Sequence, residues 1–183
     1  MSDPVQPASV YDLSHTDAPE SRATFAVLVD NEPGVLHRVV GLFAARGYNI
    51  ESLTVAETDR KAHTSRVTIV TRGTPQVLGQ IEAQLQKMVS TRHVQDVTRD
   101  PNGLERELAL VKVVGSGPDR VEALRVADIF RAKVIDTTHE SFVFELTGAP
   151  SKIDRFCDLM RPLGLVEVSR TGVLSIQRGV EAL

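Results

Sequence analysis

The chain has little cysteine, no excess of positive charge and no long hydrophobic run, and each shortage excludes a class of protein. A single cysteine, Cys157, occurs among 183 residues, so neither an internal disulfide nor a cysteine-based metal cluster is expected. The formal net charge is −3 and the two signs are interspersed, which leaves no basic patch for nucleic acid. No apolar run approaches the roughly 18 residues of a membrane-spanning helix.

The first residues also lack the features of a secretory signal, because they contain neither a basic region nor an apolar core. Cys157 falls among apolar residues in a helix that we predict over 151–161. This setting favours a buried structural thiol over a nucleophile. Together these observations predict a cytoplasmic protein.

The regular part of the chain follows a polar, proline-containing segment, residues 1–22, which we predict to be a flexible tail. Residues 23–99 form the first predicted domain. Apolar periodicity predicts its strands and helices in the order βαββαβ: strands 24–29, 50–56, 66–71 and 93–98, and helices beginning at Pro33 and, after the cap Thr74, at Pro75. This order is that of a ferredoxin-like fold, with both helices on one face of the sheet.

The second half repeats the plan after a turn-rich break at 100–103. We predict a linker at 100–106, with Glu105–Glu107 exposed to solvent, and a second domain at 107–183. Asp119 and Ser151 are its expected helix caps, and its last two strands are expected to pair as a hairpin through Gly172. The predicted fold class is α+β, with two tandem ferredoxin-like βαββαβ domains. Domains of about 75 residues have marginal cores, so we expect mutual packing or dimerisation.

The segment DNEPGVLHRVVGLFAARGYNIESL, residues 30–53, contains the most distinctive pattern. Pro33 suits a first helical turn and Gly47 suits a left-handed helix end. Gly34 at the start of the helix costs about 0.5–1 kcal/mol relative to alanine. Either the loop needs a dihedral angle that glycine adopts, or the missing side chain lets a small anion reach the N–H groups of the helix.

The residues around this helix are suited to a free branched amino acid. The helix start would bind a carboxylate, and Asn31 has both a donor and an acceptor. Asn49 and Ile50 are predicted to begin the next strand, where they would supply a polar contact and an apolar wall.

Motifs of enzyme active sites are missing from the sequence. The turn at 115–117 (GSG) lacks the Gly-Lys-Ser/Thr ending of a phosphate-binding loop, so a structural turn is the commoner explanation. The five histidines are scattered, and no nucleophile stands beside a base. We therefore expect no catalysis by the chain alone and no metal or cofactor in it.

Three segments carry a resemblance to a known family. NEPGVL at 31–36, RGYNIESLTV at 46–55 and, after the linker, ERELALVKV at 105–113 closely resemble the acetolactate synthase small subunit, whose first domain is an ACT domain. The resemblance implies a regulatory subunit without a catalytic site. It implies a large catalytic subunit as partner, which uses thiamine diphosphate, Mg²⁺ and FAD and condenses two pyruvates, or pyruvate with 2-oxobutyrate, in branched-chain amino acid biosynthesis.

The same resemblance implies that the small subunit activates its partner and confers feedback inhibition by valine. ACT domains of this family pair side by side as homodimers and bind the effector between protomers. The implied site consists of Asn31, Gly34, Val35 and Leu36 of one protomer with Asn49 and Ile50 of the other. Ala56 falls at a position linked to valine sensitivity, although packing alone would also explain a small strand residue.

Two alternative functions would each need further features in the sequence. An amino-acid-sensing ACT regulator with another partner, such as a transcription factor, would need a helix-turn-helix and a basic surface. A small ferredoxin-like enzyme would need titratable residues that converge in a cleft. The sequence leaves open whether valine, leucine or isoleucine is the effector, which surface contacts the large subunit, and what the second domain binds.

Overall fold

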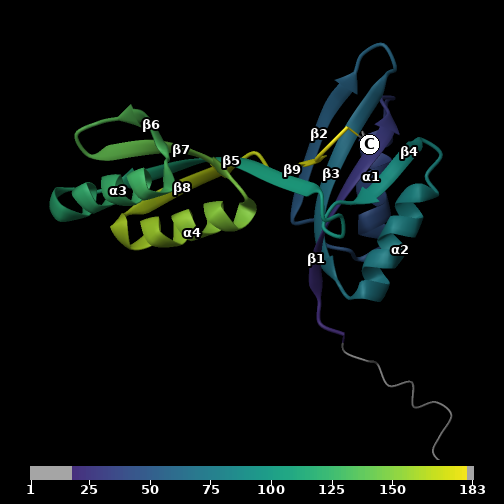
Figure 1. Ribbon diagram of the computed structural model, residues 1–183, viewed down its shortest axis with the longest axis horizontal. Helices are drawn as coiled ribbons and strands as arrows, with labels where there is room; N and C mark the ends of the chain where they lie inside the picture. The colour runs from purple at the N-terminus through teal and green to yellow at the C-terminus, as the bar shows by residue number, and fades with distance from the viewer. Residues whose placement is uncertain (1–17, 181–183) are drawn as a thin grey trace, which may run out of the picture.

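The computed structural model describes residues 18–180 and contains two α+β domains joined by one long strand (Figure 1). The elements of the first domain are β1 (Ser21–Asp30), α1 (Val35–Arg46), β2 (Ser52–Asp59), β3 (Thr64–Gly73), α2 (Pro75–Gln86) and β4 (Thr91–Asp96). Those of the second are β5 (Gly103–Val114), α3 (Gly117–Phe130), β6 (Lys133–Thr137), β7 (Ser141–Gly148), α4 (Pro150–Met160), a short 3₁₀ helix (Arg161–Leu163), β8 (Leu165–Arg170) and β9 (Leu174–Gln177).

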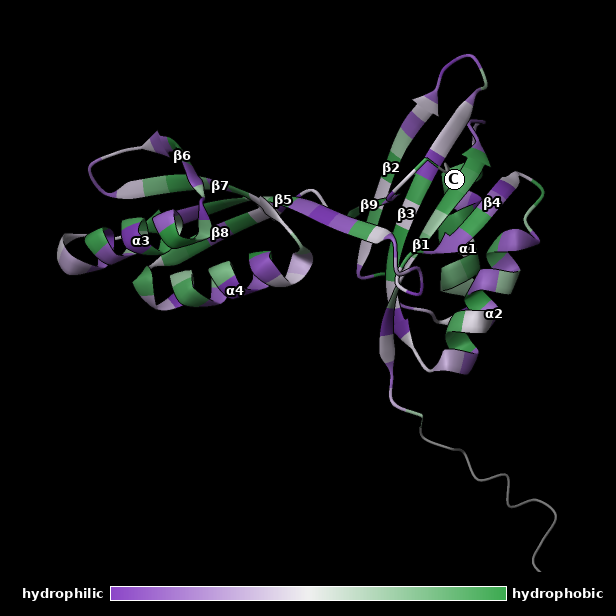
Figure 2. Ribbon diagram, viewed as in Figure 1, coloured by the Kyte–Doolittle hydropathy of each residue, from purple (hydrophilic) through white to green (hydrophobic). Residues whose placement is uncertain are grey.

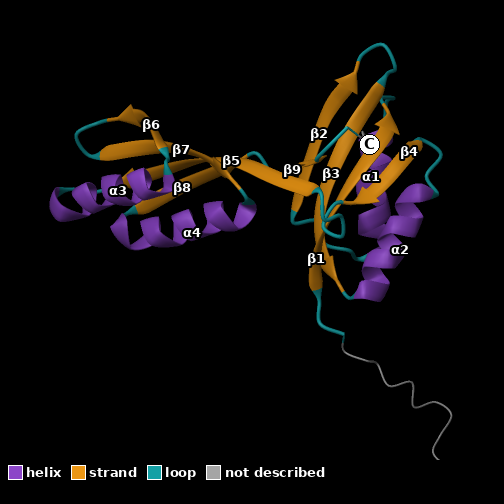
Figure 3. Cartoon of the chain, in the orientation of Figure 1, coloured by secondary structure: helices purple, strands orange, loops and turns teal. Residues whose placement is uncertain are grey.

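The first domain is an antiparallel sheet in the order β2-β3-β1-β4, with α1 and α2 on one face (Figure 3). Each helix turns a set of buried apolar side chains toward this sheet. Alternate residues of the two central strands pack against buried side chains of the helices: Val35, Val39 and Phe43 of α1, and Leu78, Ile81 and Leu85 of α2. Apolar residues are accordingly concentrated on β1 and β3 in Figure 2.

The second domain repeats this arrangement in the order β6-β7-β5-β8, with α3 and α4 on one face. Its core contains Phe142 and Phe144 of β7 and Phe156 of α4, and the buried Cys157 lies beside them as predicted. The predicted fold class, two βαββαβ units in tandem, is therefore confirmed. Within residues 18–180 no helix is both long enough and apolar enough to cross a membrane.

The predicted linker and the predicted final hairpin are both wrong. Residues 103–106 are the first part of β5, which continues without interruption to Val114. The last two strands do not pair with each other: β8 pairs with 109–113 of β5, and β9 pairs with 103–106. A strand of 12 residues can pair with both in succession, and Thr171 bridges them by donating its N–H to the carbonyl of Leu108 (3.0 Å).

Several helix starts also differ from the predictions. The helices α3 and α4 begin at Gly117 and Pro150, so Asp119 and Ser151 lie inside the first turns rather than at the caps. Prolines in those first turns have a backbone dihedral suited to helix initiation, which moves the start upstream of the polar residues. At α2 the predicted cap stands directly before a first-turn proline, and the prediction is confirmed. Thr74 accepts a hydrogen bond from the N–H of Val77 (3.4 Å).

A ribbon formed by β9 and residues 103–106 of β5 lies against the face of the first sheet that the helices leave open (Figure 1). Val173 donates its N–H to Ser52 Oγ of β2 (3.1 Å). Gly172 has φ +82, and a Cβ there would lie 2.7 Å from the same Ser52 Oγ, so glycine is needed for this close approach. The two residues that precede β9 thereby connect the second domain to the edge strand β2.

The predicted flexible tail, residues 1–22, overlaps with the first strand of the structure. Residues 1–17 lie outside the described residues, whereas Ser21 and Arg22 belong to β1.

Candidate functional site

The loop between β1 and α1 contains most of the residues predicted to bind an effector. The helix begins at Val35 rather than at Pro33, and Gly34 is the residue that precedes it. Gly34 has φ +84, a left-handed conformation that side chains disfavour. The dihedral explanation for this glycine is therefore confirmed. The space beside it is also open, since a Cβ built at Gly34 would meet nothing within 4 Å.

Several N–H groups at this end of α1 are available to a ligand. The N–H of Asn31 donates to the carbonyl of His63 (2.7 Å), and the N–H of Val35 donates to the carbonyl of Glu32 (3.2 Å). In contrast, the N–H groups of Gly34, Leu36 and His37 have no backbone acceptor among the described residues. Unpaired N–H groups and the positive end of the helix dipole together favour a bound carboxylate, the dipole by about 0.3–1 kcal/mol.

Asn49 and Ile50 lie at the opposite end of the same helix. The predicted left-handed helix end at Gly47 is confirmed, and Asn49 and Ile50 follow it. The two residues precede β2 rather than begin it, because β2 starts at Ser52. The carbonyl of Asn49 accepts a hydrogen bond from Thr71 Oγ1 (2.6 Å), while its side chain is exposed. A helix of 12 residues is about 18 Å long. One chain therefore does not bring the two parts of the predicted site together.

Three apolar side chains of α1 and β2 are exposed to solvent. Leu36 and Val40, one turn apart on α1, are 40% and 38% exposed, and Val55 of β2 is 42% exposed. β2 is also an edge strand, so one side of its backbone has no pairing strand within the described chain. Ala56 on β2 is exposed as well, with Arg66 as its partner on β3. It therefore does not pack in the core of its own chain, and its role in valine sensitivity stays a prediction.

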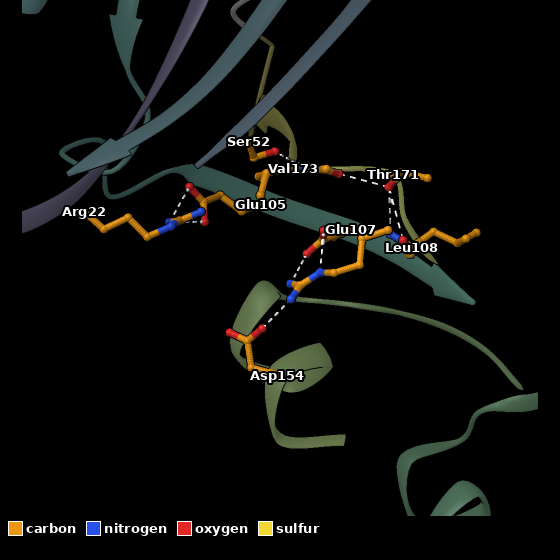
Figure 4. Close-up of polar contacts among 10 residues, drawn as sticks. Arg22, Ser52, Glu105, Glu107, Leu108, Asp154, Thr171 and Val173 are labelled. Carbon is orange, nitrogen blue, oxygen red and sulfur yellow. Dashed lines mark hydrogen bonds and ion pairs between the residues drawn. The ribbon is translucent and has the colours of Figure 1, made fainter. Parts of the chain in front are cut away.

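The junction between the domains contains a network of ion pairs that the sequence interpretation missed (Figure 4). Arg22 of β1 pairs with Glu105 of β5 (2.9 Å), and Arg170 of β8 pairs with both Glu107 and Asp154 of α4 (2.6 Å to Asp154). The hydrogen bonds with Glu107 raise the pKa of Arg170, although burial partly opposes them. Four of these side chains border a cavity of about 470 Å³ between the domains: Arg22, Glu107, Asp154 and Arg170.

The interpretation of Glu105–Glu107 as a solvent-exposed linker is wrong for Glu107, which is only 4% exposed. A sequence signal was present, because Glu107 continues the alternation of the core residues Ala109, Val111 and Val113 along one strand. The turn at 115–117 is structural, since the N–H of Gly115 donates to the carbonyl of Glu140 (3.0 Å). No cluster of His, Cys, Asp or Glu in the described residues could hold a metal ion.

Comparison with known proteins agrees with this two-domain arrangement. Residues 25–93 match the family model for the ACT domain of acetolactate synthase (AHAS) small subunits, and residues 106–179 match the model described as "Small subunit of acetolactate synthase". The chain is 46% identical over 156 residues to a protein of Archaeoglobus fulgidus named "Probable acetolactate synthase small subunit", covering 85% of this chain and 96% of that one.

Two further relatives extend the comparison to bacteria. The chain is 45% identical over 159 residues to the acetolactate synthase isozyme 3 small subunit of Escherichia coli, covering 86% of this chain and 96% of that one. The crystal structure of the acetolactate synthase small subunit from Thermotoga maritima superimposes with a TM-score of 0.76 at 37% identity, over 88% of this chain and 99% of that one. The chain therefore belongs to the family of acetolactate synthase small subunits, the regulatory and non-catalytic partners of that enzyme.

Proposed function

We propose that this chain binds the large catalytic subunit of acetolactate synthase, raises its activity and makes it sensitive to feedback inhibition by valine. Family membership supports the partner. The thiamine diphosphate, Mg²⁺ and FAD implied by the resemblance belong to the large subunit in this proposal. The observation that carries the effector site is the start of α1, where three N–H groups without backbone acceptors lie beside the open space at Gly34.

The complete effector site is formed by two protomers. The end of β2 lies near the β1–α1 loop, and its start follows Asn49 and Ile50. Antiparallel pairing of β2 with the same strand of a second chain would therefore bring Asn49 and Ile50 of one protomer to the helix start of the other. A two-fold contact is self-complementary, so it forms two such sites. The exposed side chains of Leu36, Val40 and Val55 support this contact, because pairing at the β2 edge would cover them.

The chemistry of each part suits valine. The helix start binds the carboxylate, Leu36 and Ile50 provide apolar walls for the branched side chain, and the amides of Asn31 and Asn49 contact the polar atoms. Val35 contributes by position only, since its side chain is buried in the core and its N–H is already donated to the carbonyl of Glu32.

An activity assay with the cognate large subunit tests this function. Acetolactate formation from pyruvate is measured for each subunit alone and for the mixture, with and without valine, leucine or isoleucine. We expect no turnover by this chain alone, a higher rate for the mixture than for the large subunit, and inhibition of the mixture by valine. Pyruvate turnover by this chain alone, or a stable complex with an unchanged rate and no valine response, would contradict the proposal.

A further inference from the structure

The turn between β2 and β3 is tied to the β1–α1 loop, which forms half of the proposed effector site. The N–H of Asn31 donates to the carbonyl of His63 in that turn (2.7 Å). Arg92 of β4 pairs with Asp30 (2.6 Å) and donates to the carbonyl of Ala62 (3.2 Å). The last residues of β2, which lead into this turn, therefore belong to the surroundings of the helix start.

Glu57 of β2 contacts the loop directly. Its partner on β3 is Ser65, whose partner on β1 is the core residue Val29, so Glu57 lies on the helix-covered side of the sheet. Asn31 donates through Nδ2 to Glu57 Oε1 (3.3 Å). With its nitrogen directed at Glu57, Asn31 presents Oδ1 as an acceptor, and no described residue donates to that oxygen. The Asn31 oxygen and the Glu57 carboxylate are thus two neighbouring acceptors.

Glu57 also has the weakest cationic partner of the three carboxylates around the loop. Asp30 and Glu32 are each paired with an arginine, Asp30 at 2.6 Å. Within the described chain, Glu57 pairs only with Arg60, at 3.6 Å, and the Arg60 side chain is 92% exposed. An exposed ion pair of this kind contributes little. The charge of Glu57 therefore remains available to a bound cation.

Donors and acceptors are consequently separated around the helix start. The N–H groups of Gly34, Leu36 and His37 suit a carboxylate, whereas Asn31 Oδ1 and Glu57 suit an ammonium group. We propose that Glu57, together with Asn31, binds the ammonium group of the effector and so selects an amino acid over the 2-oxo acid with the same carbon skeleton. This inference rests on the proposed function, because it assumes that the effector carboxylate binds at α1.

Such selection would distinguish the effector from a compound that resembles it closely. Valine and its 2-oxo analogue share the carboxylate and the branched side chain, and they differ only at C2. The N–H groups and the apolar walls cannot distinguish them. A carboxylate beside C2 can, because it attracts the ammonium group and repels the partial negative charge of a carbonyl oxygen.

Calorimetry on the full chain tests the proposal with L-valine, isovalerate, which lacks the amino group, and 2-oxoisovalerate. For Glu57→Gln we expect valine to bind about tenfold more weakly or worse, as for the loss of a hydrogen bond between charged groups. Isovalerate and 2-oxoisovalerate should bind Glu57→Gln at least as well as wild type. Glu122→Gln is the matched control, since Glu122 forms the same kind of exposed pair, with Arg125, on α3. It should behave as wild type.

An unchanged ratio of valine to isovalerate affinity in Glu57→Gln would overturn the proposal. Glu57→Ala separates charge from orientation, because glutamine can still accept a hydrogen bond from Asn31 and alanine cannot. Loss of selectivity in Glu57→Ala alone would show that Glu57 only orients Asn31, which also overturns it. A wild-type chain that binds neither valine nor isovalerate would instead refute the effector site itself.

Discussion

The replacement of Gly34 by aspartate separates the two explanations for this glycine, provided that asparagine is tested beside it. At φ +84 a side chain costs about 1–2 kcal/mol, and asparagine and aspartate tolerate this region best. A Cβ at Gly34 meets no atom within 4 Å, so neither variant creates a clash within the chain. Gly34→Asp and Gly34→Asn therefore share the same backbone strain and nearly the same size, and they differ by one negative charge.

The charge sets the expected size of the effect. Two like charges about 4 Å apart repel by about 4 kcal/mol at an effective dielectric constant near 20. Gly34 is exposed, so solvent reduces this value, and half of it still weakens binding by more than tenfold. Folding is affected less, because a carboxylate at the helix start is favoured by the dipole by about 0.3–1 kcal/mol.

Valine binding by calorimetry, together with activation of the large subunit, decides between the explanations. We expect Gly34→Asn to bind valine within a few-fold of wild type and Gly34→Asp to bind more than tenfold more weakly than Gly34→Asn. Both variants should still activate the large subunit. Equal valine affinity of the two variants would refute the electrostatic reasoning, and loss of activation in both would show a structural role only.

Three further predictions concern the dimer, the junction and the thiol. Leu36→Glu should shift the chain from dimer to monomer in analytical ultracentrifugation, whereas Leu124→Glu on α3, equally exposed at 40%, should not; the same behaviour in both would contradict the proposed interface. Glu107→Gln should lower the free energy of unfolding, measured in urea, by about 1–3 kcal/mol, because it weakens a buried charged hydrogen bond. The control Glu167→Gln, at an exposed residue, should have no measurable effect. Equal stability of the two variants would show that the buried pair contributes nothing. Cys157 should react slowly with iodoacetamide at pH 8 in the native protein and rapidly in the unfolded protein. The reason is that burial raises the pKa of its thiol and so lowers the thiolate fraction at a given pH. Equally fast labelling in both states would refute this prediction.

The order of elements and the core of each domain were predictable from the sequence. Helical and strand periodicities are local, so Val39 and Phe43 of α1 could be assigned to the core before any contact was known. Gly47 could be assigned to the helix end for the same reason, because a left-handed end depends on a few neighbouring residues. The need for glycine at position 34 was also predictable, since its left-handed conformation depends on a few neighbouring residues.

Only the tertiary structure decided where the distant segments meet. Local patterns cannot distinguish a β8–β9 hairpin from two strands that pair in succession with β5, because both use the same residues and differ only in a long-range register. Likewise, the burial of Glu107 depends on Arg170, 63 residues away. The contact of Asn31 with Glu57 depends on how the β2–β3 turn folds back on β1. Periodicity specifies which face of an element is apolar, whereas partners across the fold are selected by the free energy of the whole packed chain.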